Sequence, residues 1–268
     1  MAQADKIFSS SIASIYDDLM GPVFFAPYAE DLGRRASALK PATILETAAG
    51  SGISTEALVK AAPGAALTAV DLNQAMIDVA SAKPGLNKVQ WQACDATKLP
   101  FADGLFDLVA CQFGVMFFPD KVAAFAETRR VLKPGGSFIF SVWDALDVNP
   151  VPDAVLWELA KLFPANPPSF MRRLPHGFFD VPELTRALLA AGFSKVAAEH
   201  VELACNAPSA RHLAIALCQG TPMRPEIEAL SPGRLEEVTE AVAAGLARKF
   251  GNGEVRSTMQ AIVFEAKS

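Results

Sequence analysis

The stretch Ile44–Gly52 constrains the fold more than any other part of this 268-residue chain. A short apolar run ends in the acid Glu46, and a loop of small residues with Gly50 and Gly52 follows. Glycine adopts backbone angles that other residues resist, and a helix that begins after such a loop offers unpaired N–H groups. A second apolar run then ends in Asp71. This order predicts a nucleotide-binding βαβ unit whose second acid binds a ribose.

A single Gly-x-Gly loop also occurs in ordinary tight turns, so the rest of the chain has to support the interpretation. Apolar runs alternate with amphipathic helical patterns along most of the sequence, which favours a parallel sheet with helices on both sides. Asn73 is expected to cap the second of these helices. The expected strands are 43–46, 66–70, 88–93, 106–111, 137–143, 193–203 and 254–266.

An N-terminal helical cap is expected over residues 1–40. Gly21-Pro22 is expected to break it into two helices, because this dipeptide favours a turn. The first helix has an apolar face of Phe8, Ile12, Ile15 and Leu19.

The remainder, 41–268, is expected to form one ligand-binding domain with insertions at 144–180 and 207–252. Six prolines, Pro150 and Pro152 among them, are expected to interrupt one short helix, Ala154–Phe163, in the first insertion. It follows the fifth strand at the ligand edge of the sheet, so we expect a lid rather than a plain connection. In the second insertion, Ser231 is expected to cap a helix that has Pro232 at its first position.

Composition excludes several classes of function. The formal net charge is −5 and no run of lysine and arginine occurs, which argues against nucleic acid as the main partner. The four cysteines share no close spacing, so neither a metal site nor a disulfide framework is expected. No signal peptide and no apolar run of membrane length are evident, and we therefore expect a cytoplasmic protein without stable membrane insertion.

Five short motifs occur in order within residues 40–143. They are Glu46-Thr47-Ala48-Ala49-Gly50-Ser51-Gly52, Val70-Asp71-Leu72, Cys94-Asp95-Ala96, the run from Leu99-Pro100-Phe101 to Phe106-Asp107-Leu108-Val109, and Val131-Leu132-Lys133-Pro134-Gly135-Gly136. Together they resemble class I S-adenosylmethionine-dependent methyltransferases, and within that class the ubiquinone/menaquinone biosynthesis type. Ala48 replaces the family's usual first glycine, and Glu46 replaces its commoner aspartate.

The resemblance implies an α/β fold: a Rossmann-like, seven-stranded, mostly parallel sheet with an antiparallel last strand and helices on both faces. It also implies S-adenosyl-L-methionine as cofactor and S-adenosyl-L-homocysteine as product. Glu46 is expected near the cofactor's ammonium group, Asp71 at its ribose and Asp95 at its adenine. The expected cofactor-binding residues are Tyr16, Glu46, Ala48, Gly50, Gly52, Asp71, Leu72, Met76, Asp95, Ala96 and Gln112.

The methyl acceptor is expected to be a small or medium molecule of apolar or aromatic character, since aromatic residues are frequent near the ligand side. His176 is a candidate general base, needed only if the attacking atom is protonated. The protein is expected to be a monomer or homodimer. The expected substrate-pocket residues are Phe25, Tyr28, Phe113, Phe117, Trp143 and His176.

Two alternatives stay open on the sequence alone. An NAD(P)-dependent oxidoreductase shares the glycine loop and Asp71, but Glu46, Thr55 in place of a third glycine, and Asp95 count against it. A non-catalytic protein that binds S-adenosylmethionine is the other alternative, because a fold does not guarantee an activity.

Overall fold

The computed structural model describes residues 15–268 and divides into two compact units. We call Tyr28–Trp143, Phe178–Val201 and Ala261–Ser268 the sheet unit. Within the described residues, the helical unit comprises 15–27, Asp144–Gly177 and Glu202–Gln260. The expected division into a cap over 1–40 and one domain over 41–268 stays a prediction.

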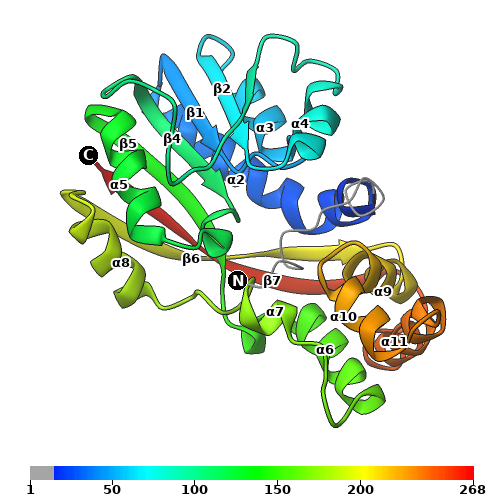
Figure 1. The fold of residues 1–268 in the computed structure, drawn as a ribbon. Helices are drawn as coiled ribbons and strands as arrows, with labels where there is room; N and C mark the ends of the chain where they lie inside the picture. The colour runs from blue at the N-terminus through cyan, green and yellow to red at the C-terminus, as the bar shows by residue number, and fades with distance from the viewer. Residues whose placement is uncertain (1–14) are drawn as a thin grey trace. The chain divides into compact units, whose positions relative to one another are not determined.

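A seven-stranded sheet with the order β3-β2-β1-β4-β5-β7-β6 organises the chain (Figure 1). Neighbours among β1 to β5 pair in parallel, whereas β7 pairs antiparallel with β5. This confirms the predicted fold class. The strands are β1 Thr43–Thr47, β2 Ala66–Asp71, β3 Gln90–Ala93, β4 Phe106–Gln112, β5 Leu132–Trp143, β6 Lys195–Ala207 and β7 Val255–Lys267.

Helices cover both faces of the sheet unit, as Figure 1 shows with α3 and α4 on one side and α5 and α8 on the other. On the first face, Leu32 and Leu58 belong to one buried cluster with Ile44 of β1. On the second face, the ring of Phe125 lies 5.9 Å from that of Phe138. The helices are α2 Ala26–Leu39, α3 Ile53–Ala61, α4 Gln74–Ser81, η3 Val115–Phe117, α5 Lys121–Val131 and α8 Val181–Ala190.

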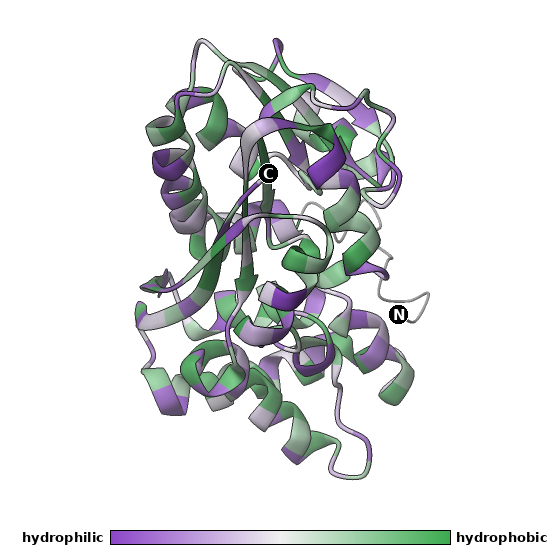
Figure 2. Cartoon of the chain, turned by 90° about the vertical axis from the view of Figure 1, so that its left-hand side faces the viewer, coloured by the Kyte–Doolittle hydropathy of each residue, from purple (hydrophilic) through white to green (hydrophobic). Residues whose placement is uncertain are grey.

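Local sequence signals explain where several of these helices begin. The Asn73 side chain accepts a hydrogen bond from the backbone N–H of Ala75 at 3.0 Å, which confirms the predicted cap of α4. Asp120 caps α5 in the same way through Ala123 N–H at 2.9 Å. The central strands are largely hydrophobic (Figure 2), as strands covered on both faces require.

The helical unit has its core where α9, α11 and α6 meet. Leu213, Leu217, Val242, Leu246 and Leu159 are fully buried or nearly so. No helix within residues 15–268 combines the length and the apolar character needed to span a membrane. The elements are η2 Tyr16–Phe25, η4 Leu146–Val148, α6 Pro150–Leu162, α7 Phe170–Arg173, α9 Ala210–Gln219, α10 Met223–Leu230 and α11 Leu235–Phe250.

The predicted break at Gly21-Pro22 is wrong. A π-helix, η2, runs through Pro22 and leads directly into α2, and the N–H of Ala26 donates to the carbonyl of Gly21. The wider π-turn absorbs the disruption that a proline causes inside a regular helix. Two residues of the predicted apolar face, Phe8 and Ile12, lie outside the described residues.

Two predictions in the insertions also need correction. Ser231 does not cap α11; its N–H donates to Ile227 at 2.9 Å and ends α10, a helix that the sequence analysis missed. In the first insertion, Pro150 begins α6 instead of interrupting it. Proline is tolerated in a first helical turn because the N–H groups there have no intrahelical acceptor.

Candidate functional site

The carboxyl ends of β1, β2 and β3 place three predicted acids along one edge of the sheet. Glu46 is in register with Ala69 of β2, and Asp71 is in register with Ala93, after which Asp95 follows. Parallel strands end at the same edge, so the order β3-β2-β1 brings the three carboxylates onto neighbouring strand ends. The structure therefore brings together the acids that the sequence analysis singled out.

The backbone conformation of the loop after β1 would allow a ligand to lie close to the main chain. Gly50 has φ +56° and Gly52 has φ +86°, and no atom lies within 4 Å of where a Cβ of Gly50 would be. Ala48 also adopts the left-handed region, with φ +53°, at the position where the family commonly has glycine. A non-glycine residue there is strained, and such strain tends to occur at functional sites.

Asp71 holds this loop against the end of β2. The Gly50 N–H donates to Asp71 Oδ2 at 2.8 Å, and the Asn73 N–H donates to Oδ1 at 2.8 Å. Burial raises the pKa of Asp71, while these N–H groups lower it. Each carboxylate oxygen has a second lone pair, so both can still accept ribose hydroxyls.

Glu46 is the most buried of the three acids, with no exposed surface. Ser54 donates to its Oε1, and Thr55 donates to its Oε2 at 2.5 Å. Burial raises the pKa of Glu46 to about 7, against the lowering effect of the two hydroxyl groups. The sequence analysis missed Ser54 and Thr55 as partners; two hydroxyl residues in the first turn after the glycine loop were the available signal.

Asp95 is exposed, unlike Glu46. Its Oδ1 accepts from the N–H and the Oγ1 of Thr97, at 2.8 and 2.7 Å. Leu72 is 60% exposed, so its apolar side chain is accessible to a ligand, as the expected packing on the adenine requires. Met76 is buried in α4, and Ala96 is half-buried.

One buried polar atom at the loop points to a ligand. Ser51 is 2% exposed, and its Oγ has no hydrogen-bond partner among the described residues. Such a hydroxyl costs roughly 1–3 kcal/mol if nothing satisfies it. With the open space at Gly50, this makes the loop suited to a ligand with polar groups, as S-adenosylmethionine has.

Three aromatic residues of the sheet unit form a cluster at the carboxyl ends of β4 and β5. The Phe113 and Trp143 rings stack with centroids 4.0 Å apart, and Tyr28 meets both rings edge-on at 5.3 and 5.4 Å. Phe113 has φ +55° and directly follows Gln112, the last residue of β4. Phe117, in η3, is half-buried. Three of the predicted pocket residues therefore contact one another.

The helical unit contains the other predicted site residues. Tyr16 stacks on Phe25 with ring centroids 4.7 Å apart. His176 is buried, and its Nδ1 lies 2.7 Å from the backbone oxygen of Asp144. Burial lowers the pKa of His176 to about 4, so the ring is neutral at pH 7. Because a carbonyl only accepts, Nδ1 has the proton and Nε2 has the lone pair.

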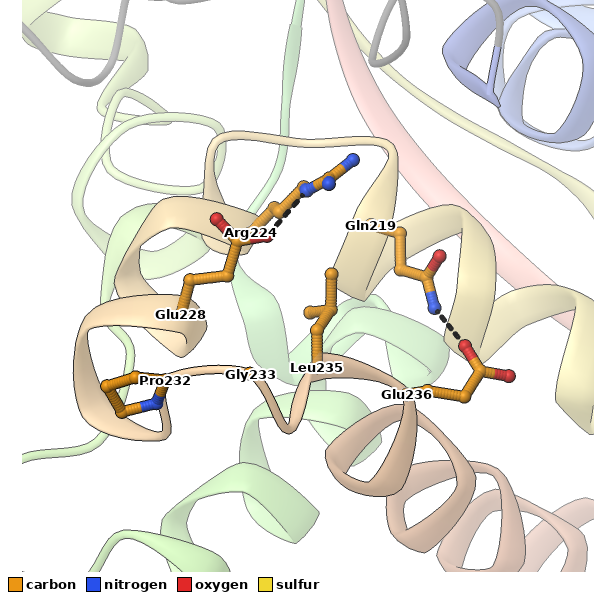
Figure 3. Close-up of a pocket in the computed structure, with 7 residues that line it drawn as sticks. All are labelled: Gln219, Arg224, Glu228, Pro232, Gly233, Leu235 and Glu236. Carbon is orange, nitrogen blue, oxygen red and sulfur yellow. Dashed lines mark hydrogen bonds and ion pairs between the residues drawn. The ribbon is translucent and has the colours of Figure 1, made fainter.

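A cavity of about 470 Å³ lies in the helical unit, bordered by α9, α10 and α11 (Figure 3). Arg224 pairs with Glu228 at 2.9 Å, and Gln219 donates to Glu236 at 3.0 Å, as the dashed lines show. None of the predicted site residues lines it. Within the described part of the chain, no group of three or more His, Cys, Asp and Glu residues is arranged to hold a metal ion.

Comparison with known proteins agrees with this geometry. Residues 45–140 match the family model of the methyltransferase domain. A demethylmenaquinone methyltransferase from Clavibacter sepedonicus is 33% identical over 192 residues, which cover 64% of this chain and 76% of that protein. A malonyl-(acyl-carrier protein) O-methyltransferase from Geobacter sulfurreducens is 34% identical over 165 residues, covering 60% of this chain and 59% of that protein.

The fold also has a counterpart among solved structures. The phosphoethanolamine N-methyltransferase 2 of Haemonchus contortus, in complex with S-adenosyl-L-methionine, aligns with a TM-score of 0.62 at 17% identity, covering all of this chain and 60% of that one. The family match decides against the oxidoreductase alternative and confirms S-adenosylmethionine as the cofactor. The chain belongs to the class I S-adenosylmethionine-dependent methyltransferases.

Proposed function

We propose that this methyltransferase transfers the methyl group to a small or medium, apolar or aromatic acceptor, and that Glu46, Asp71 and Asp95 bind its cofactor. The observation that supports this most is the placement of these three acids on neighbouring strand ends, beside a strained loop of small residues. S-adenosylmethionine supplies an electrophilic methyl group on a positively charged sulfur. The protein's task is then to orient the two reactants and exclude water.

Each residue of the proposed cofactor site is assigned a role toward one part of the cofactor. The Glu46 carboxylate accepts from the amino group, Asp71 accepts from the ribose hydroxyls, and Asp95 accepts from the adenine amino group. The remaining residues of the sheet unit shape the site around the ligand: Ala48, Gly50 and Gly52 offer close backbone approach, Leu72 and Met76 cover the adenine, Ala96 N–H faces it, and Gln112 reaches the methionine portion.

The aromatic cluster of Tyr28, Phe113 and Trp143 supports an apolar or aromatic acceptor. The Phe113 and Trp143 rings stack on each other and are only 5% and 7% exposed, so they give this end of the sheet an apolar, aromatic interior. The two relatives described above act on different acceptors, as their names state, so they do not select the acceptor or the atom that is methylated. We also propose a cytoplasmic enzyme that is a monomer or homodimer.

Asp71→Ala tests the cofactor site. The loss of charged hydrogen bonds to the ribose should weaken S-adenosylmethionine binding by roughly 1–3 kcal/mol, measured by calorimetry. Asp78→Ala is the matched control, because Asp78 is an exposed acid of α4 that pairs with Gln74. Unchanged affinity in Asp71→Ala would refute the assignment. Methyl release with a panel of apolar and aromatic acceptors tests the proposed acceptor class.

His176 is the proposed general base, in the event that the acceptor loses a proton on methylation. The hydrogen bond at Nδ1 places the lone pair on Nε2, whereas burial lowers the pKa of His176 to about 4 and so makes the ring a weak base at pH 7. His176→Ala should then lower the turnover rate by roughly 10²-fold or more while S-adenosylmethionine affinity is retained. Full turnover in this variant would eliminate the base.

A further inference from the structure

Two hydroxyl groups from the first turn of α3 clamp the buried Glu46 side chain. Ser54 Oγ donates to Oε1 of the carboxylate, and Thr55 Oγ1 donates to Oε2 at 2.5 Å. Glu46 and Thr55 have no exposed surface, and Ser54 is 6% exposed. Both oxygens of one carboxylate are thus held by consecutive residues of a single helix.

The two hydroxyl groups do not serve their own helix. Serine and threonine in a first turn commonly bond to nearby backbone groups. The N-cap of α3 is Gly52, which makes no side-chain hydrogen bond. Ser54 and Thr55 instead donate hydrogen bonds to the carboxylate of Glu46 on β1. This indicates a role other than helix capping.

We propose that Ser54 and Thr55 are positioning residues that orient the Glu46 carboxylate toward the amino group of S-adenosylmethionine. The inference rests on the proposed role of Glu46. A carboxylate has about four lone-pair directions, and the two hydroxyls occupy one on each oxygen. The remaining directions are thereby fixed, which limits the rotamer freedom of a side chain one methylene longer than aspartate.

The electrostatic surroundings of Glu46 make this clamp measurable. Burial raises the pKa of Glu46 to about 7, the charge of Asp71 adds to that rise, and the two hydroxyls oppose it. Cys111 also interacts with Glu46, and burial raises the pKa of its thiol to about 12, so it is neutral. Removing a hydroxyl should therefore move the ionisation of Glu46 to higher pH.

Calorimetric binding of S-adenosylmethionine to Thr55→Val and Ser54→Ala, from about pH 6.5 to about pH 8.5, tests the proposal. We expect roughly tenfold weaker binding than wild type at the lower pH, narrowing to about threefold or less at the higher pH. The cofactor's own amino group titrates near 8, but it is the same in every protein and cancels in the ratio. Thr55→Ser keeps the hydroxyl and should bind as wild type does.

Two further variants separate the possible failures. Thr239→Val removes a buried hydroxyl of α11 that donates to Leu235 at 2.8 Å, and it should bind the cofactor normally. A deficit in Thr55→Val that Thr55→Ser shares would show a packing defect and overturn the clamp. If Glu46→Gln binds as wild type, the role of Glu46 fails and the inference with it. If only Glu46→Gln is weakened, the role of Glu46 stands and the clamp is refuted.

Discussion

Replacing Gly52 with alanine should lower the free energy of unfolding through two separable effects. The first is conformational, because Gly52 has φ +86° and an L-residue in the left-handed region costs roughly 1–2 kcal/mol. The second is steric, because a Cβ at Gly52 would lie 2.9 Å from the Cβ of Ala80 in α4. Forcing a methyl group into a packed region costs about 1–3 kcal/mol. Gly52→Ala should therefore lower the free energy of unfolding by about 2–5 kcal/mol.

Gly50→Ala isolates the conformational part. Gly50 has φ +56°, but no atom lies within 4 Å of its would-be Cβ, so only the conformational cost of roughly 1–2 kcal/mol applies. Ala80→Gly addresses the steric part. Alone it should cost about 1 kcal/mol of helix propensity, but in Gly52→Ala it removes the contact and should recover most of the steric cost.

Urea unfolding of the four proteins in this double-mutant cycle, followed by circular dichroism, gives the coupling energy between positions 52 and 80. We expect a favourable coupling of about 1–3 kcal/mol. Equal destabilisation by Gly50→Ala and Gly52→Ala, or additive effects of Gly52→Ala and Ala80→Gly, would refute the packing argument.

Three further predictions follow from buried charge, a hydrogen-bond hub and the insertion. The pKa of Glu46 rises from its usual 4.5 to about 7 on folding, so between these pH values the folded state binds more protons than the unfolded state and its stability falls as pH rises. Glu46→Gln should flatten this dependence of the urea unfolding midpoint on pH. An unchanged dependence would contradict the prediction. Arg130 donates to the carbonyls of Phe101 and Leu99 at 2.7 and 2.9 Å. Arg130→Lys should therefore lower the free energy of unfolding by about 1–2 kcal/mol. The control Arg129→Lys should leave it within about 0.5 kcal/mol of the wild-type value. The lid predicted over 144–180 should exchange amide hydrogens more slowly with S-adenosylmethionine bound, and equal exchange in both states would argue against it.

The sequence alone was sufficient for the fold class and for the order of the acids. Strand and helix periods and the cap at Asn73 depend on residues close together in the chain, so their pattern can be read without coordinates. The positions of Glu46, Asp71 and Asp95 after successive apolar runs then followed, because parallel strands end at one edge. Predictions from local sequence were wrong at two positions. Pro22 was expected to break a helix but lies inside a π-helix, and Ser231 was expected to begin a helix but ends α10.

Only the tertiary structure decided the environment of each side chain. The pairing of Glu46 with Ser54 and Thr55, the cluster of Tyr28 with Phe113 and Trp143, and the neutral state of His176 arise from contacts between separate segments. Burial, and hence pKa, depends on everything that surrounds a group in space, including residues far along the chain. A sequence pattern therefore identifies which residues lie at the sheet edge. The folded chain determines the protonation state of each side chain and the direction in which it points.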